Sequence, residues 1–168
     1  FDEGRYWDVE VRYAKAGPEE IHIRIIATNR GPASATLHVL PTLWFRNTWS
    51  WGADDRKPRL RLDQDHPFVI RARHFDDGLR QLICDDTTVQ PEMLFTENET
   101  NHRRLFQHEN GQSYAKDAFH DYFVHGRIDA VNPDQHGTKM GAHYALDIAP
   151  GDRATVRLRL RAGESLGE

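Results

Sequence analysis

The sequence predicts an all-β fold, a mostly antiparallel β-sandwich with one or two short inserted helices. Apolar and polar residues alternate from 7 to 13, from 21 to 28 and from 155 to 161, with Ile26 as the exception. Alternation of this length is typical of strands that have one buried and one solvent-facing side, as in antiparallel sheets. Roughly eight to ten short strands separated by turn residues describe a sandwich.

Turn chemistry supports this division of the chain. Asp76-Asp77-Gly78 lies between two strand-like runs, and an Asp-Gly pair in such a place is a strong hairpin signal. Pro150-Gly151-Asp152 joins the runs 142–149 and 154–161. Residues 37–45 suggest another strand, which Pro41 interrupts. Because proline has no N–H to donate to a sheet, this strand is expected at an edge or a bulge.

The stretch 99–127 lacks alternation and predicts an excursion that carries the short helices. Asn98 or Thr100 is expected to cap a first helix that ends near Leu105. A second helix is expected within 113–125, with an apolar side made of Phe119, Tyr122 and Phe123. Residues 132–139 read as a loop by composition.

Composition narrows the classes of function. The chain has 22 Lys and Arg against 26 Asp and Glu, a net charge of −4, and the basic residues are scattered along the sequence. A nucleic acid or an anionic membrane needs a basic face, so neither is expected as a partner. No apolar run approaches the roughly 20 residues that span a bilayer. The single cysteine, Cys84, excludes an internal disulfide and fits a reducing, cytoplasmic compartment.

The chain is expected to be one β-sandwich domain, 1–168, or part of one, within a longer multidomain protein. It begins with Phe1 and not with methionine, and its first residues do not form a signal peptide. If the first strands of the sandwich were missing, open sheet edges would favour self-association.

Patterns for catalysis and for metal binding are weak. The pairs Asp54-Asp55, Asp76-Asp77 and Asp85-Asp86 fall at turns or strand ends, where aspartate is a favoured turn residue, and this reading outweighs a glycosidase pair. The ten histidines show no zinc-protease spacing and have no cysteine partners, so no metal and no other cofactor is expected. Nucleophile-elbow and phosphate-loop motifs are absent from the sequence.

Three of the four tryptophans fall within residues 40–52. Such a block forms either the centre of a core or a platform for a flat ligand such as a sugar, because aromatic faces bury sugar C–H surface while arginine and asparagine bind hydroxyls. The strand half, Leu40 to Phe45, is expected to pack inward, and Arg46 to Gly52 to face a partner.

These residues also carry a family resemblance. The stretches Tyr6–Tyr13, Ile23–Ile25, Thr28–Pro32 and Leu40–Gly52, followed by Lys116–His120, Gly137–Lys139 and His143-Tyr144, resemble bacterial glycoside hydrolases of family 63. These enzymes are relatives of the processing α-glucosidases that trim glucose from oligosaccharides. The resemblance implies an N-terminal β-sandwich followed by an (α/α)6 toroid that holds both catalytic carboxylates. No catalytic residue is therefore carried over to this chain.

The resemblance implies a non-catalytic N-terminal domain that packs on the toroid of the same protein and helps to shape the pocket for an oligosaccharide. The candidate contact residues are Trp44, Arg46, Asn47, Trp49, Trp51, Lys116, Asp117, His120, Thr138 and Lys139. Two other classes stay open. A free-standing carbohydrate-binding module would need an exposed row of aromatic rings, and a scaffold or assembly domain would form a stable oligomer.

Overall fold

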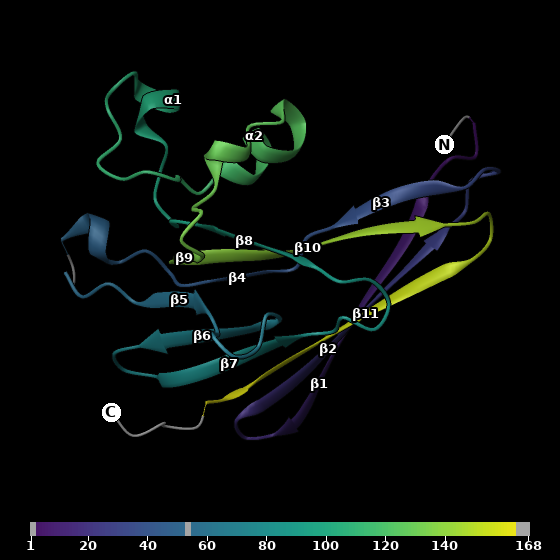
Figure 1. Ribbon diagram of the computed structural model, residues 1–168, viewed down its shortest axis with the longest axis horizontal. Helices are drawn as coiled ribbons and strands as arrows, with labels where there is room; N and C mark the ends of the chain where they lie inside the picture. The colour runs from purple at the N-terminus through teal and green to yellow at the C-terminus, as the bar shows by residue number, and fades with distance from the viewer. Residues whose placement is uncertain (1–2, 53–54, 164–168) are drawn as a thin grey trace.

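The computed structural model describes residues 3–52 and 55–163, with the backbone alone at Trp51. It confirms an all-β, sandwich-like fold built from two mostly antiparallel sheets, with the helices α1 and α2 on the outer side of the smaller one (Figure 1). The large sheet contains, in spatial order, β1 (Trp7–Gly17), β2 (Glu20–Asn29), β11 (Arg153–Ala162), β7 (Gly78–Cys84), β6 (Val69–His74), β5 (Arg59–Leu62) and β9 (His136–Gly137).

The small sheet is built around β10 (Lys139–Ile148). β8 (Glu92–Thr96) pairs along one side of β10, and β3 (Ala35–Val39) and β4 (Thr42–Trp44) pair along the other. β3 and β4 keep one register with β10, because Val39 lies opposite Tyr144 and Trp44 lies opposite Lys139. They are thus one edge strand that Pro41 interrupts, as the sequence predicts.

The core lies between the two sheets, where the inward side of each alternating strand is apolar. From the small sheet, Phe95, Met140 and Tyr144 are fully buried, and from the large sheet Leu60 and Ile70 are fully buried. Tyr144 satisfies its hydroxyl by donating to the carbonyl oxygen of Asp85 at 2.9 Å. Burial of such a polar tip is tolerated because the tip keeps a hydrogen-bond partner.

The predicted turns are confirmed. Asp76 and Asp77 connect β6 to β7, which pair as a hairpin, and Gly78 adopts a φ of 70° that favours glycine. Gly151 lies in the turn between β10 and β11 with a φ of 76°. This second turn carries the chain from the small sheet to the large one, so β10 and β11 belong to different sheets.

The helices are shorter than the sequence suggests. α1 (His102–Phe106) is capped by Asn101, whose side chain accepts from the N–H of Arg104, so the prediction of Asn98 or Thr100 as cap was wrong. α2 (Ala118–His125) begins later than the predicted 113, because Tyr114 has a φ of 57° that a helix does not accommodate. Two short 3-10 helices, η1 (Trp49–Trp51) and η2 (Ile128–Ala130), complete the described elements.

The segment 132–139 is only partly a loop. It contains β9, which pairs with β5 in the large sheet, and Lys139 opens β10 in the small sheet. The chain therefore passes between the sheets at Thr138. Among the described residues, no helix is both long and apolar enough to cross a membrane.

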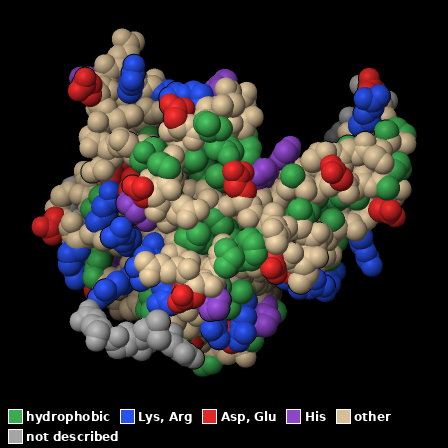
Figure 2. Space-filling view, viewed as in Figure 1, with side chains coloured by type: hydrophobic (Ala, Val, Ile, Leu, Met, Phe, Trp, Pro, Cys, Tyr) green, Lys and Arg blue, Asp and Glu red, His purple; other side chains and the backbone are tan. Residues whose placement is uncertain are grey.

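In the view of Figure 1, hydrophobic and basic side chains occupy different parts of the surface. Hydrophobic side chains show below the helices and across the middle of this face, and Lys and Arg side chains gather at the left edge, over η1 and β5 (Figure 2). The candidate site lies at this edge, where the ends of the strands of both sheets meet η1.

Candidate functional site

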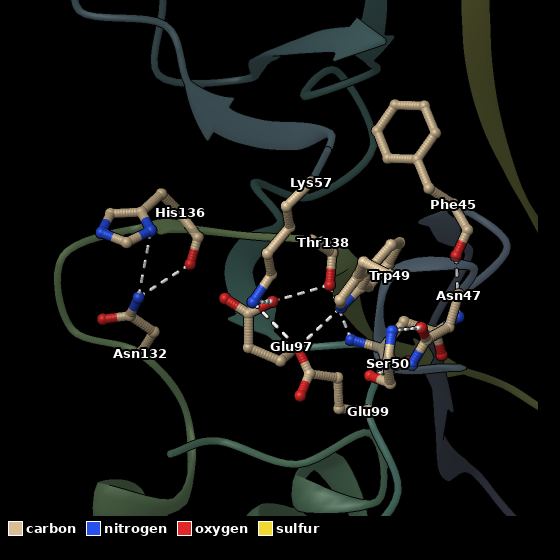
Figure 3. Close-up of polar contacts among 11 residues, drawn as sticks. Phe45, Asn47, Trp49, Ser50, Lys57, Glu97, Glu99, Asn132, His136 and Thr138 are labelled. Carbon is tan, nitrogen blue, oxygen red and sulfur yellow. Dashed lines mark hydrogen bonds and ion pairs between the residues drawn. The ribbon is translucent and has the colours of Figure 1, made fainter. Parts of the chain in front are cut away.

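One network of hydrogen bonds and ion pairs links the tryptophan block, residues 40–52, to the segment that follows β8 (Figure 3). The indole N–H of Trp49 donates to Oε1 of Glu99 at 2.8 Å. Nζ of Lys57 lies 2.9 Å from the same oxygen and 3.0 Å from Oε2 of Glu97. One ammonium thus bridges two carboxylates whose side chains are only 14% and 16% exposed, and the lysine also lies 5.8 Å from the centre of the Trp49 ring.

Electrostatics favour the charged form of this lysine. Burial lowers the pKa of Lys57, but the hydrogen bonds and charges of Glu99 and Glu97 outweigh burial and raise the pKa overall. Both carboxylates are engaged with donors and sheltered from water. The arrangement therefore stabilises the fold locally and leaves neither Glu97 nor Glu99 as an open acid or base.

Asn47 and Asn98 form a second hydrogen-bonded link between the tryptophan block and the segment that follows β8. Asn47 accepts from the N–H of Ser50 at 3.0 Å, which sets the turn into η1, and its amide nitrogen donates to the carbonyl oxygen of Asn98 at 3.0 Å. Asn98 donates in return to the carbonyl oxygen of Phe45 at 2.8 Å. These reciprocal bonds make Asn47 a structural residue that holds the block against the segment after β8.

Thr138 has a similar structural role at the crossing between the sheets. Its hydroxyl donates to Oε2 of Glu97 at 2.7 Å and accepts from the N–H of Asn98 at 2.7 Å. The residue is buried, so it does not contact solvent or a partner. The neighbouring Gly137 is required by space, because a Cβ there would lie 2.2 Å from the carbonyl oxygen of Thr96.

The sequence predicts that Leu40 to Phe45 pack inward and that Arg46 to Gly52 face a partner, and this prediction was partly wrong. Leu43 and Phe45 pack on the core as predicted, but Trp44 is 53% exposed. Trp44 lies opposite Lys139, whose side of β10 faces away from the core, and strand alternation therefore turns its ring outward. Trp49, expected to face a partner, is instead half-buried and bonded to Glu99. The side chain of Trp51 lies outside the described residues.

Arg46 is exposed, and within the described part of the chain it forms no side-chain hydrogen bond or ion pair. It follows Trp44 by two residues along the same edge. Within the described part of the block, an exposed indole ring and a guanidinium without an acidic partner are thus both accessible to a ligand.

Lys139 lies beside this edge and is held in place. Its ammonium donates to the carbonyl oxygen of Lys116 at 2.8 Å and lies 5.0 Å from the centre of the Phe119 ring. Burial lowers the pKa of Lys139, and the nearby Lys116 lowers it further, while Asp117 raises it. The N–H of Lys116 donates to the carbonyl oxygen of Glu99 at 2.9 Å, so Glu99 connects the block to the start of α2.

The other two predicted contact residues behave differently. Asp117 accepts from the guanidinium of Arg104 at 3.0 Å and from the amide of Asn101 at 3.1 Å, and it thereby ties α1 to α2. His120 is exposed on α2, where its ring meets that of His125 edge-on at 5.2 Å. In the described part of the chain, no hydrogen bond, ion pair or ring contact joins His120 to the tryptophan block.

Sequence reasoning missed Lys57, Glu97 and Glu99. The signal was the spacing of the two glutamates, since residues two apart in extended chain point to one side. This spacing does not predict that Lys57, about forty residues earlier, is the partner of the two glutamates. It also does not predict that the strand ends bring the lysine and the glutamates together. Of the predicted aspartate pairs, Asp76-Asp77 lies in a turn and Asp85-Asp86 follows the end of β7. Asp55 lies in the irregular segment before β5, and Asp54 lies outside the described residues.

A second polar cluster crosses the outward side of the small sheet. Nδ1 of His38 and Nε2 of His143 lie 2.8 Å apart, and Nδ1 of His143 lies 3.2 Å from Oε2 of Glu92. Tyr122 of α2 donates to Glu92, and this bond raises the pKa of Tyr122 to about 12. No group of three or more potential metal ligands of the His, Cys, Asp and Glu types occurs among residues 3–52 and 55–163.

Comparison with known proteins places this chain near one much longer protein. No family model matches the sequence. The chain is 35% identical over 179 aligned residues to the uncharacterized protein YMR196W of Saccharomyces cerevisiae. The match covers 92% of this chain but only 16% of the yeast protein. The chain thus spans about a sixth of the length of the curated relative it matches.

Proposed function

We propose that this chain is the non-catalytic N-terminal β-sandwich domain of a family-63-like glycoside hydrolase, acting in the cytoplasm as an α-glucosidase or related enzyme. The exposure of Trp44 and Arg46 at an edge that is otherwise rigidly bonded carries the proposal. The small share of the yeast relative that the chain covers agrees with a domain of a larger protein. The buried free thiol of Cys84 agrees with a reducing compartment.

In the intact enzyme, two carboxylates of an (α/α)6 domain and a water would hydrolyse the glucosidic bond. The sandwich would supply one wall of the pocket. The ring of Trp44 would cover the C–H face of a glucose unit, and Arg46 and Lys116 would donate to sugar hydroxyls or to carboxylates of the catalytic domain. Trp49, Asn47 and Thr138 would not contact the sugar but would hold this edge in a single conformation.

Hydroxyl-radical footprinting of the full-length protein tests the proposal. Oxidation of Trp44 is expected to fall when a slowly hydrolysed malto-oligosaccharide is added. Oxidation of Tyr13, which is 71% exposed on β1, is expected to stay constant and serves as the control. Equal oxidation of Trp44 with and without the oligosaccharide, under conditions in which the sugar is bound, would overturn the assignment of this edge to the pocket.

The second candidate is a free-standing carbohydrate-binding module, which the 53% exposure of Trp44 favours. Titration of the isolated chain with malto-oligosaccharides, followed by tryptophan fluorescence, separates the two. Saturable quenching supports an independent module. Unchanged fluorescence supports a pocket that is completed only by the catalytic domain.

A further inference from the structure

The outer face of the large sheet carries arginines in register with one another. Arg12 on β1 lies directly opposite Arg24 on β2, and Arg24 lies directly opposite Arg157 on β11. Like charges directly opposite each other destabilise a sheet. Three guanidiniums in one row therefore repel one another, and negative charge beside them offsets this repulsion. The scattered arginines of the sequence become a basic patch only through this register.

Acidic side chains of the same chain offset the charges of these three arginines to different degrees. Arg12 bonds to Glu10 on its own strand, and Arg157 lies 3.8 Å from Oδ2 of Asp85. Arg24, at the centre of the row, forms no side-chain hydrogen bond or salt bridge in the described part of the chain, although the charge of Glu10 lies near it. Arg153, farther along β11, is likewise exposed and without such a partner in the residues described.

These arginines border a hollow of about 410 Å³ over β1, β2 and β11. Its floor includes Thr28 and Thr155, which are half-buried, and its β1 side is formed by Asp8 and Glu10 together with Arg12. The volume is in the range of small-molecule sites. The other side of β2 and β11 belongs to the core, so the hollow lies on the outer face of the large sheet, away from the tryptophan block.

The lining combines two kinds of group. Guanidiniums bind phosphate and carboxylate through paired N–H donors, and Arg24, Arg153 and Arg157 supply these on one side. The carboxylates of Asp8 and Glu10 accept from Arg30 and Arg12 and retain lone pairs that can accept from hydroxyls, and the two threonines both donate and accept. From this combination we infer that the hollow binds a small sugar that carries an oxyanion group, either a phosphate or a carboxylate.

The same lining disfavours an extended polyanion. Asp8 and Glu10 would repel the backbone of a nucleic acid or an anionic membrane, and the hollow has no aromatic ring on which a base could stack. A compact ligand that places its anionic group near Arg24 and its hydroxyls near β1 meets both halves of the site.

Isothermal titration calorimetry of the full chain with glucose 6-phosphate, glucuronate, glucose and inorganic phosphate tests the inference. One or both of the anionic sugars are expected to bind saturably, and the better of the two identifies the oxyanion. Neutral glucose and inorganic phosphate are expected to bind at least about tenfold more weakly, because each meets only half of the lining. Rising salt is expected to weaken binding of the anionic sugar.

A matched pair of variants locates the site. Arg24→Gln is expected to weaken binding of the anionic sugar about tenfold or more. Arg59→Gln changes an arginine that lies opposite another arginine, Arg73, on the same face but away from the hollow, and is expected to leave binding unchanged. Absence of saturable binding, equal binding of inorganic phosphate, or equal losses in the two variants would each overturn the inference.

Discussion

Trp49 donates its indole N–H to Oε1 of Glu99 at 2.8 Å, so one of the three tryptophans that the sequence offers as a sugar platform is held in place by the structure. The bond links η1 to the segment after β8, fifty residues later in the chain. Glu99 in turn shares Lys57 with Glu97, and its backbone holds Lys116. Trp44, five residues earlier, is an accessible aromatic residue at this edge.

This arrangement predicts that Glu99 contributes to stability. Glu99→Ala removes the acceptor of the Trp49 indole and one of the two partners of Lys57, and hydrogen bonds to charged groups contribute about 1.5–3 kcal/mol. We expect the free energy of unfolding to fall by about 1–3 kcal/mol in urea denaturation. Trp44→Ala is the control, with a loss of about 0.5 kcal/mol or less, and equal losses in the two variants would contradict the network.

Gly137 is expected to tolerate no side chain. A Cβ at this position would meet the carbonyl oxygen of Thr96 at 2.2 Å, and both backbones are fixed by the pairing of β9 and β8 with their neighbours. Gly137→Ala should lower the free energy of unfolding by about 3 kcal/mol or more, or prevent folding.

The matched control for Gly137 is Gly17→Ala at the end of β1. A Cβ at Gly17 would have no atom within 4 Å, and the backbone there does not adopt a positive φ. We expect a melting temperature close to that of the wild type. A melting temperature for Gly137→Ala that matched the Gly17→Ala value would show that the crossing between the sheets is looser than described.

The stabilising effect of Lys57 should depend on pH. Its pKa is raised in the folded protein above the ordinary value of 10.5, so the charged form stabilises folding below that pH. The contribution is lost as the pH rises through the folded-state pKa. Urea midpoints of the wild type and of Lys57→Met should differ clearly at pH 8 and converge above pH 10.5. A difference that stayed constant across this range would exclude the charge as its source.

Cys84 should be chemically silent in the folded protein. Burial raises the pKa of its thiol to about 12, although the neighbouring hydroxyl of Tyr144 acts in the opposite direction. Because the thiolate is the reactive form, iodoacetamide at pH 8 should modify Cys84 only after unfolding in urea. Modification of the native protein at the rate of a free thiol would contradict the burial of β7.

The strands were predictable because the alternating runs of β2 and β11 have an apolar side that the opposite sheet buries, as Ile25 and Val156 illustrate. The prediction of a buried side was wrong for most of β1, where Val9, Val11 and Tyr13 are exposed. The site was less predictable, since its parts come from distant segments. Nothing in the local sequence links Lys57 to Glu97. Strand alternation places Trp44 on the side opposite to Leu43 and Phe45, but the interruption of the edge strand at Pro41 obscured that alternation in the sequence.

The alignment of arginines on the outer face of the large sheet was likewise not predictable from the sequence. Arg12, Arg24 and Arg157 lie far apart in the sequence, and only the strand order β1-β2-β11 and its register align them. Alternation of Arg with Leu from 157 to 161 marks a basic outward side of one strand. Which strands lie beside it is decided by the pairing of non-consecutive strands, which a single sequence does not specify.

The kinetics of two tryptophan variants in the full-length protein test the central claim most directly. With a malto-oligosaccharide as substrate, Trp44→Ala is expected to lower kcat/KM about tenfold or more at an unchanged melting temperature. Trp49→Phe is expected to lower the melting temperature while kcat/KM stays within about twofold of the wild type. An unchanged kcat/KM in Trp44→Ala would contradict the proposal that this edge forms a wall of the substrate pocket.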